Sequence, residues 1–394
     1  METSQPIHVV LAGGGTAGHV NPLLSIAQKI REIEPTACIS VIGTAQGLEA
    51  DLVPRAGFEL DTIDKVAFPR TLNAATFTFP VRFVKQLNAV REILTRRQAD
   101  IVVGVGGYAS APAYVQAHRM GIPFVIHEQN ASAGMANKLG ARWAHFVGLT
   151  YDDCGIKPSN DSQVMRVGLP LREVIAQRAH ALEVDRAATK YTAAQELGLD
   201  PELPIVAVTG GSLGALSINT AVANASRELL SHAQVVHLTG RGKSEHVKKI
   251  VSAMAGTKVI SGLGSTDGDY HVSEYFEGMD AVMAAADLVI CRSGAGTVAE
   301  LTALGIPAVY VPLPIGNGEQ RLNALPVVEA GGGIIVPDSE LSDVWIEHNV
   351  IPLLSDTDRL RAMGKAAWNY GKRDAAQFMA QKTLDIAHQY KTRA

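Results

Sequence analysis

A strand, a glycine-rich turn and a helix follow one another at the start of the chain, and this order restricts the fold. Residues 7–11 (IHVVL) are largely apolar and rich in β-branched side chains, as in a strand buried on both faces of a parallel sheet. Gly13, Gly14 and Gly15 then permit a tight turn with positive φ. An apolar stripe over 23–30 predicts the helix that follows. Free N–H groups and the positive end of a helix dipole predict an anion site here, with phosphate as the expected group.

The glycines of residues 13–18 also satisfy the dinucleotide-binding pattern G-x-G-x-x-G. That pattern requires an acidic residue about 20 positions further on, at the tip of the second strand, to bind a ribose. The second strand is predicted over 37–42, and its tip, residues 43–45, reads GTA without a carboxylate. Glu49 follows only several residues later. The sequence therefore disfavours NAD.

His19 is unusual in this position because a turn that only binds a nucleotide does not need an imidazole. A base at the mouth of a phosphate site is suited to proton transfer. The alternative is a histidine at a helix start that is bonded to a nearby carbonyl. Both readings remain open at this point.

Composition indicates a large globular protein and argues against a nucleic-acid-binding, a disulfide-stabilised or a membrane-spanning protein. The chain has 394 residues, of which 47% are apolar and 19% charged, so two domains with large cores are expected. A net charge of −4 does not favour nucleic-acid binding. Three scattered cysteines are too few for a disulfide framework or a zinc site and fit a reducing cytoplasm. The start of the chain does not resemble a signal peptide, and no apolar run is long enough to span a bilayer, so any membrane contact is expected to be peripheral.

Predicted strands and helices alternate throughout, which indicates an α/β protein with parallel sheets. The alternation weakens over residues 173–202, which are charged, alanine-rich and helical, and it restarts with a strand at 204–209. We therefore predict a first domain over 1–172 and a second over 173–373. The last helix, about 374–394, is expected to pack back on the first domain.

Glycine turns and polar side chains recur where predicted strands end. The turns are Gly106–Ser110, Gly210–Ala215 and Arg292–Thr297, and the sequence HEQN (127–130) follows a strand at 124–126. In open α/β sheets, ligands bind at the edge formed by the carboxyl ends of the strands. We favour a site at HEQN over the alternative of a helix cap built by Asn130.

Residues 65–97 contain seven basic residues and one acidic residue, with four phenylalanines among them. An apolar stripe over 84–94 predicts a helix packed on the sheet. The preceding stretch, Phe68–Pro80, is predicted to be a loop. It is either an ordinary loop or an apolar foot on an anionic membrane surface, in which Phe77 and Phe79 would insert.

Two other motifs are only weak indications of a binding site. Residues 237–244 end like a phosphate-binding P-loop, but His237 stands where the first glycine is required. Asp267 and Asp269 imitate a metal-binding pair within a Gly/Ser/Asp-rich loop. We predict no metal site and no cofactor.

Two halves of this kind are the plan of the GT-B glycosyltransferases, and the motifs resemble one family among them. The segments GGGTAGHVNP, GGYAS, HEQN, GGSLGA and RSGAGTVAEL occur in the order and spacing of the MurG family. The resemblance covers nearly the whole chain. It implies a GT-B fold, in which two Rossmann-like domains face each other across a cleft. It also implies inverting transfer of N-acetylglucosamine (GlcNAc) from UDP-GlcNAc to the 4-hydroxyl of MurNAc in undecaprenyl-pyrophosphoryl-MurNAc-pentapeptide, in peptidoglycan biosynthesis.

The resemblance also implies site residues, position by position. Those expected to bind UDP-GlcNAc are Thr16, Ala17, Gly18, Asn130, Arg172, Ser212, Phe276, Ala295, Gly296, Thr297, Glu300 and Gln320. The chain departs from the family pattern at three points, where Ala17 replaces a common glycine, Leu169 changes the GNP-x-R motif and Glu319 precedes Gln320. For Gln320 the alternative is a residue of a loop that caps the following helix.

The mechanism we expect is a single displacement. His19, tuned by Glu128, removes the proton of the acceptor hydroxyl, which attacks the anomeric carbon, while helix N-termini hold the departing UDP without a metal. Glu128 has the alternative role of orienting the acceptor. The first domain is expected to bind the lipid acceptor at the cytoplasmic face of the membrane, with other cell-wall enzymes as potential partners. Rival interpretations are a nucleotide-sugar epimerase, a nicotinamide oxidoreductase and a non-catalytic sensor of UDP-GlcNAc.

Overall fold

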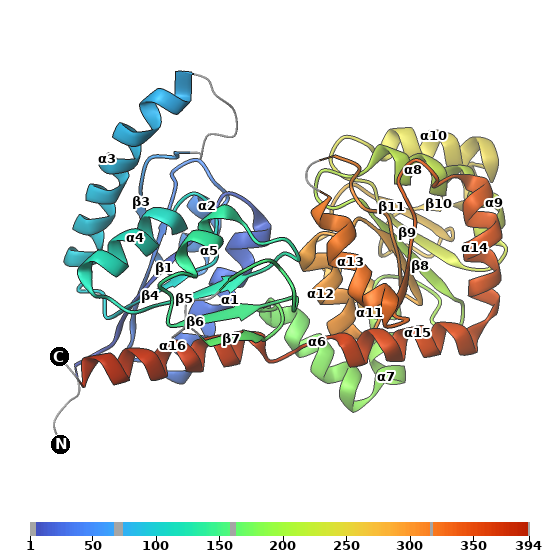
Figure 1. Cartoon of the computed structure of the whole chain (residues 1–394). Coiled ribbons are helices and arrows are strands. Elements are labelled where there is room, and N and C mark those ends of the chain that lie inside the picture. Colours follow the sequence, from blue (N-terminus) through green and yellow to red (C-terminus); the bar gives the residue numbers. More distant parts are fainter. Residues whose placement is uncertain (1–4, 67–73, 158–162, 316–317, 393–394) are drawn as a thin grey trace. The chain divides into compact units, whose positions relative to one another are not determined.

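The computed structural model describes residues 5–66, 74–157, 163–315 and 318–392, with the backbone alone over 74–78. Contacts between residues divide the chain into two units, which we describe separately. Unit 1 comprises residues 1–172 and 373–394, and unit 2 comprises 173–372. Figure 1 shows that each unit is built around one sheet with helices on both faces.

The sheet of unit 1 has seven strands in the order β3-β2-β1-β4-β5-β6-β7, and all neighbouring pairs are parallel. Its strands are β1 (His8–Ala12), β2 (Cys38–Gly43), β3 (Glu59–Thr62), β4 (Ile101–Gly104), β5 (Phe124–Glu128), β6 (Phe146–Leu149) and β7 (Gln163–Arg166). The expected strand at β1 lies one residue further along the chain, and β6 was not anticipated. Because the strand order reverses between β1 and β4, the carboxyl ends of these strands form the switch point at which such sheets bind ligands.

Helices cover both faces of this sheet because alternate strand residues point to opposite sides. Val10 and Ala12 pack with one set of helices, and Val9 and Leu11 pack with the other. The first set is α3 (Ala74–Arg96), α4 (Ser110–Met120) and α5 (Met135–Gly140), and the second is α1 (Ala17–Ile33), α2 (Glu49–Arg55) and α16 (Ala375–Lys391). The last helix of the chain therefore lies in unit 1, against α1.

The sheet of unit 2 repeats this plan, in the order β10-β11-β9-β8-β12-β13-β14, again with all pairs parallel. Its strands are β8 (Ile205–Thr209), β9 (Gln234–Leu238), β10 (Ile260–Ser261), β11 (Tyr270–Ser273), β12 (Leu288–Cys291), β13 (Ala308–Tyr310) and β14 (Gly333–Ile335). Here the order reverses between β8 and β12. Two sheets of parallel strands confirm the predicted fold class.

The helices of unit 2 also lie on both faces of its sheet. They are α6 (Glu173–Val184), α7 (Arg186–Glu196), α8 (Leu216–Asn224), α9 (Ser226–Leu230), α10 (Ser244–Met254), α11 (Met279–Ala285), α12 (Ala295–Leu304), α13 (Glu319–Glu329), α14 (Asp343–Ser355) and α15 (Thr357–Tyr370), with a 3₁₀ turn η1 (Thr257–Val259). One core cluster packs strand residues such as Val206 and Val208 against Ile218 of α8 and Val350 of α14.

The structure corrects two predicted boundaries in unit 1. Helix α3 begins at Ala74 and includes Pro80, so the second half of the predicted loop Phe68–Pro80 is helical. Phe68 itself and the side chain of Phe77 lie outside the described residues. The strand β5 extends to Glu128, so His127 and Glu128 belong to a buried strand and not to the loop after it.

Candidate active site

Two glycine turns meet at the switch point of unit 1. The turn after β1 and the turn after β4 lie side by side because the two strands are neighbours. A Cβ atom on Gly107 would lie 2.5 Å from the carbonyl oxygen of Gly14, and Gly107 has φ +88°. Only glycine permits this close approach of the two backbones. The predicted convergence of these turns at one sheet edge is therefore present in the structure.

His19 lies in the first turn of α1, directly at this edge. Its Nδ1 is 3.0 Å from Oγ1 of Thr16, the residue that caps the helix. A Cβ on Gly106 would lie 3.3 Å from both Cδ2 and Nε2 of the ring, so the glycine leaves space beside Nε2. Burial lowers the pKa of His19, and the negative charge of Glu49 opposes this. The ring is therefore neutral near neutral pH, which is the protonation state of a base.

Glu49, which was not among the residues predicted for the site, occupies the first glycine turn. Its Oε2 accepts a hydrogen bond from the Gly15 N–H at 2.7 Å, and its Oε1 accepts from the Thr44 N–H and hydroxyl at 2.9 and 2.7 Å. Burial alone would raise the pKa of Glu49, but these hydrogen bonds outweigh burial and the pKa is lowered. The phosphate that we predicted for this turn would have to compete with an internal carboxylate at Gly15.

Ala17 and Gly18 also present backbone donors at this turn. They are the first two residues of α1, whose N–H groups have no intrahelical partner. Both residues are exposed, and no acidic side chain lies in the first helical turn. The anion site predicted at residues 13–18 stays a prediction, for which the start of α1 offers these N–H groups.

Three of the four side chains of HEQN are used inside the protein. The ring of His127 and the amide of Gln129 are buried. His127 Nε2 contacts the Gly168 carbonyl at 2.8 Å. Burial lowers the pKa of His127 to about 4, so the ring stays neutral. Asn130 is half-buried and is the member of the four that retains access to solvent. HEQN is therefore mainly a scaffold that supports Asn130 and the loop at Gly168.

Glu128 holds the loop after β5. Its Oε1 accepts from the Asn130 N–H at 2.9 Å, and its Oε2 accepts from the Gly134 N–H at 3.0 Å and from Asn137 Nδ2 at 2.9 Å. Burial raises the pKa of Glu128, and these hydrogen bonds oppose the shift. The charge that acts on His19 is that of Glu49. Both carboxylate oxygens of Glu128 are thus engaged within the protein, and its two predicted roles, tuning His19 or orienting the acceptor, stay predictions.

Asn137 connects these parts and was missed by the sequence analysis. Its Nδ2 donates to Glu128 and to the His127 carbonyl, and its Oδ1 accepts from the Tyr114 hydroxyl at 2.8 Å. The same Nδ2 would lie 3.3 Å from a Cβ on Gly106, as the His19 ring does. An asparagine inside a short helix carries no sequence signal for such a role.

The turn after β8, at the switch point of unit 2, closes on itself. The Gly214 N–H donates to the Gly211 carbonyl at 2.8 Å, and Gly211 N–H donates to Thr209 Oγ1 at 3.1 Å. A Cβ on Gly214 would lie 2.0 Å from the Thr239 carbonyl oxygen, so this glycine is required. Ser212 is exposed at the tip of the turn.

The turn after β12, by contrast, is open. Gly294 caps α12 without a side-chain hydrogen bond, and added Cβ atoms at Gly294 and Gly296 would meet nothing within 4 Å. No acidic side chain lies in the first turn of α12. The N–H groups of residues 295–297 therefore have no intrahelical partner, as an anion site at a helix start requires.

Gln320 is oriented by this turn. Its Oε1 accepts from the Ser293 N–H at 3.2 Å and from the Leu313 N–H at 3.0 Å. With its oxygen used in this way, Gln320 offers only its Nε2 hydrogens to a ligand. The neighbouring Gly316 and Asn317 lie outside the described residues.

The other residues implied by the resemblance are placed as follows. Phe276, Thr297 and Glu300 are half-buried in unit 2, and Ala295 is buried at the start of α12. Arg172 is half-buried and is the last residue of unit 1 before the boundary. No ligand is present, so these positions carry no observed contact to a nucleotide.

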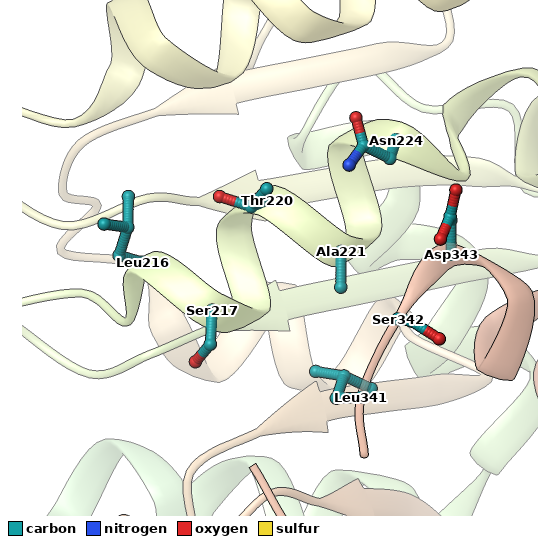
Figure 2. A pocket seen from close by; sticks show the side chains of 8 residues that line it. All are labelled: Leu216, Ser217, Thr220, Ala221, Asn224, Leu341, Ser342 and Asp343. Carbon is teal, nitrogen blue, oxygen red and sulfur yellow. The ribbon is translucent and has the colours of Figure 1, made fainter. Parts of the chain in front are cut away.

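A surface cavity of about 500 Å³ in unit 2 contains none of the predicted residues (Figure 2). It is lined by Leu216, Ser217, Thr220, Ala221, Asn224, Leu341, Ser342 and Asp343, from α8 and the start of α14. Several of its polar groups are engaged within the protein. Ser342 Oγ caps α14 at the Trp345 N–H, Ser217 Oγ donates to Asp338, and Thr220 contacts His246. The polar groups of this cavity thus serve the structure of unit 2.

Over the part of the chain that the structure describes, no group of three or more His, Cys, Asp and Glu side chains forms a metal site. Asp267 accepts a hydrogen bond from Ser265 Oγ within its own loop, at 2.8 Å. Within the same ranges, no helix combines the length and the apolar character that a bilayer span needs.

Comparison with known proteins gives consistent results for both units. The family model described as "Glycosyltransferase family 28 N-terminal domain" matches residues 9–148, and "Glycosyltransferase family 28 C-terminal domain" matches residues 205–379. The chain is 58% identical over 385 residues to UDP-N-acetylglucosamine--N-acetylmuramyl-(pentapeptide) pyrophosphoryl-undecaprenol N-acetylglucosamine transferase of Bifidobacterium adolescentis, covering 97% of this chain and 98% of that protein.

Solved structures share the fold at low identity. The structure of Acinetobacter baumannii MurG matches with a TM-score of 0.75 and 24% identity over 96% of this chain and all of that one. UDP-GlcNAc 2-epimerase from Neisseria meningitidis, bound to UDP-GlcNAc, matches with a TM-score of 0.66 and 14% identity over 96% of this chain and all of that one. The fold is therefore common to a transferase and an epimerase and does not by itself distinguish them.

Proposed function

The chain belongs to glycosyltransferase family 28, and from this premise we propose that it transfers GlcNAc from UDP-GlcNAc to undecaprenyl-pyrophosphoryl-MurNAc-pentapeptide, the lipid I to lipid II step of peptidoglycan synthesis. The identity of 58% over nearly the full length to a transferase named for this reaction carries the proposal. An epimerase has only the fold in common with this chain, at 14% identity. The two glycine turns, one occupied by a carboxylate and one open, fit a division into acceptor chemistry and donor binding.

We propose that unit 2 binds the nucleotide sugar. The N–H groups of residues 295–297 and the dipole of α12 stabilise the diphosphate, and they stabilise it more strongly as negative charge grows on the leaving UDP. Gln320 donates from Nε2 to a hydroxyl or carbonyl of the sugar, because its oxygen is already used. Ser212, Phe276 and Glu300 complete the donor site of unit 2 on the family pattern. The same pattern assigns Asn130 and Arg172 of unit 1 to donor binding.

We propose that His19 of unit 1 is the general base. Its neutral ring takes the proton of the 4-hydroxyl of MurNAc, the hydroxyl oxygen forms a bond to the anomeric carbon, and the bond from that carbon to the UDP oxygen breaks with its electron pair leaving on UDP. A single displacement of this kind inverts the anomeric centre. Space beside Nε2, left by Gly106, supports access of an acceptor hydroxyl to the ring.

The test of this function measures UDP release from UDP-GlcNAc with and without a short-chain lipid I analogue, in EDTA. We expect release only in the presence of the acceptor and undiminished by the chelator. Conversion of the sugar without acceptor would establish an epimerase, and binding without any release would establish a sensor. The anomeric configuration of the disaccharide product, read by NMR coupling constants, tests inversion separately.

We also propose that helix α3 places unit 1 on an anionic membrane surface. The side chains of Val81 and Val84 are 75% and 55% exposed and lie one turn apart. Arg82 is exposed between them, and Lys85 follows, paired with Asp64 at 3.0 Å. Apolar side chains with basic neighbours fit insertion into an anionic surface, at which each basic residue contributes about 1 kcal/mol.

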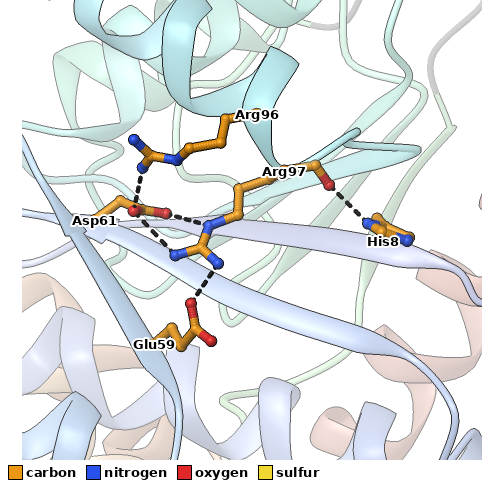
Figure 3. A network of polar contacts seen from close by, with 5 residues as sticks. All are labelled: His8, Glu59, Asp61, Arg96 and Arg97. Carbon is orange, nitrogen blue, oxygen red and sulfur yellow. Dashed lines mark hydrogen bonds and ion pairs between the residues drawn. The ribbon is translucent and has the colours of Figure 1, made fainter.

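The C-terminal end of α3 is held against the sheet by ion pairs, and these anchor the helix that carries the exposed valines. Asp61 of β3 accepts hydrogen bonds from Arg96 at 2.6 Å and from Arg97 Nε at 2.8 Å, and Arg97 also pairs with Glu59 (Figure 3). The Arg97 carbonyl contacts His8 Nδ1 at 2.7 Å.

Replacing Val81 and Val84 by serine is expected to weaken sedimentation with vesicles of anionic lipid while leaving UDP-GlcNAc binding unchanged. Phe79 is a less direct target than the sequence suggested, because its ring stacks on Phe83 with centroids 5.4 Å apart. Serine at Val184, which is 74% exposed on α6 of unit 2, is the matched control. Equal vesicle binding by both variants would show that α3 is not the contact.

A further inference from the structure

Glu49 sits in a cradle of three glycines at the first turn of unit 1. Its side chain is 1% exposed, and Cβ atoms added to Gly14, Gly43 or Gly47 would lie within 2.1 to 2.6 Å of its atoms. Three glycines, one from the turn after β1 and two from the end of β2 and the loop after it, therefore leave room for one carboxylate. Burying an unpaired carboxylate is strongly unfavourable. The space that the glycines leave for this side chain is therefore a structural feature of the turn.

The hydrogen bonds of Glu49 connect this cradle to His19. The carboxylate binds the Gly15 N–H, and Gly15 directly precedes Thr16, the cap of α1. The Thr16 carbonyl accepts from the His19 N–H at 3.0 Å, and Thr16 Oγ1 lies 3.0 Å from His19 Nδ1. A single chain of contacts thus runs from the carboxylate to the ring.

We propose that Glu49 is a positioning residue of the transfer reaction: it takes the place of a bound anion in the first glycine turn and fixes the start of α1, and with it the ring of His19. The inference rests on the proposed role of His19 as base. It accounts for the glycine pattern of residues 13–15 without a nucleotide at Gly15, because the N–H of Gly15 is taken by the carboxylate. The charge of Glu49 also raises the pKa of His19, against the effect of burial.

Other charged or titratable groups face the same site and must be distinguished from Glu49. Glu128 reaches it through Asn137, and the Tyr108 ring lies 3.7 Å from a Cβ placed on Gly15. Lys65 Nζ lies 4.7 Å from the centre of the Tyr108 ring. A test therefore needs a variant of Glu49 that removes its charge and a control that removes an equal charge from the same helix without touching the turn.

The variant is Glu49→Gln and the control is Asp51→Asn. Asp51 lies two residues further along α2, is exposed and pairs with Arg55. The first measurement is the pKa of His19 in the full chain, by NMR of selectively labelled histidine, with His19→Gln to assign the signal. We expect the pKa of His19 to fall in Glu49→Gln, because the carboxylate no longer stabilises the protonated ring, and to stay unchanged in Asp51→Asn.

The second measurement is the pH profile of kcat. A general base works when neutral, so activity rises with pH through its pKa, and a lower pKa moves this acid limb to lower pH. Glu49→Gln should show that displacement together with a loss of kcat of about 10- to 100-fold from misplacement of the ring, with an unchanged KM for UDP-GlcNAc. Thr44→Val, which removes one hydrogen bond and keeps the charge, should leave the acid limb in place.

Two outcomes would overturn the proposal. One is an unchanged pKa of His19 in folded Glu49→Gln, and the other is a normal kcat in that variant. If Glu49→Gln does not fold, Glu49→Asp keeps the charge but shortens the reach to Gly15, and normal kcat in that variant would equally overturn positioning. Because the NMR measurement needs no turnover, absence of transferase activity in the wild type would refute the proposed function while leaving the coupling between Glu49 and His19 measurable.

Discussion

The first turn of unit 1 and the turn after β12 in unit 2 share a strand, a glycine-rich bend and a helix start, but they are filled differently. At Gly14, space for a side chain is taken by the carboxylate of Glu49, whereas at Gly294 and Gly296 an added Cβ meets nothing within 4 Å. The first turn carries His19, and the second is flanked by the neutral amide of Gln320. The same local fold thus carries a histidine near an internal carboxylate in one unit and a turn without an acidic side chain in the other.

This difference separates two requirements that conflict in a single site. A negative charge close to a histidine raises its pKa and makes it a stronger base, but the same charge repels a diphosphate. Placing the carboxylate in one turn and leaving the other free of acidic side chains satisfies both. The comparison therefore predicts that substitutions in the two turns have distinct effects, the largest of which concern turnover.

The largest effect is expected from His19→Ala. Loss of a general base typically costs 10²- to 10⁴-fold in rate, and we expect kcat to fall by about that factor. Because the donor turn lies in unit 2, the dissociation constant for UDP-GlcNAc, measured by calorimetry, should change little. His246→Ala, at an exposed histidine of unit 2, is the control. Near-normal turnover of His19→Ala would remove the base from the first turn.

The contrast between the turns was only partly visible in the sequence. The strand-turn-helix order located β1 and β8 to within a residue, because β-branched runs followed by glycine have few alternatives. The short strand β6 was missed, since four residues that include Gly148 show no clear period. Helix α3 passes through Pro80, where the composition suggested a break.

The site was harder to predict because sequence does not show which way a polar side chain points. HEQN was correctly recognised as unusual, but His127, Glu128 and Gln129 turned out to be buried and bonded within the protein. Glu49 was dismissed for lying too far along the chain for a ribose, yet the fold of the segment after β2 returns it to Gly15. Contacts between segments of this kind depend on tertiary structure and leave no local pattern.

The second prediction compares the same substitution in the two turns. Gly14→Ala places a Cβ 2.4 Å from the Glu49 carboxyl carbon at φ +148°, and we expect the free energy of unfolding of unit 1 to fall by about 2–4 kcal/mol through strain and lost hydrogen bonds. Gly294→Ala, at φ −60° with open space, should change the free energy of unfolding of unit 2 by less than about 0.5 kcal/mol. Denaturant unfolding measures both, and equal destabilisation would contradict the comparison.

The third prediction gives the donor turn the charge that the first turn contains. Gly296→Asp puts a carboxylate in the first turn of α12, where it favours the helix but competes with a diphosphate. We expect the affinity for UDP-GlcNAc to fall by about 10- to 30-fold, or about 1.4–2 kcal/mol. Gly296→Asn has nearly the same size without charge and should lose less. Equal losses in the two variants would mean that space, and not charge, defines this turn.

The fourth prediction concerns a feature that the units share, a neutral histidine inside a sheet. Burial lowers the pKa of His127 in β5 to about 4 and that of His237 in β9 to about 3. Below pH 6.5 the unfolded chain binds protons that these rings do not, so stability falls with decreasing pH, by about 1.4 kcal/mol per pH unit for each ring. The loss ends near pH 4 in unit 1 and continues to about pH 3 in unit 2.

Tryptophan fluorescence can follow the units separately, because Trp143 lies in unit 1 and Trp345 and Trp368 lie in unit 2. In a Trp143→Phe background, His237→Gln should reduce the pH dependence of unfolding between pH 6.5 and 4 by about 1.4 kcal/mol per pH unit. His127→Gln should leave the pH dependence of unit 2 unchanged in the same background. If both variants alter unit 2 equally, the two sheets do not unfold independently, and the turns would have to be compared as parts of one cooperative structure.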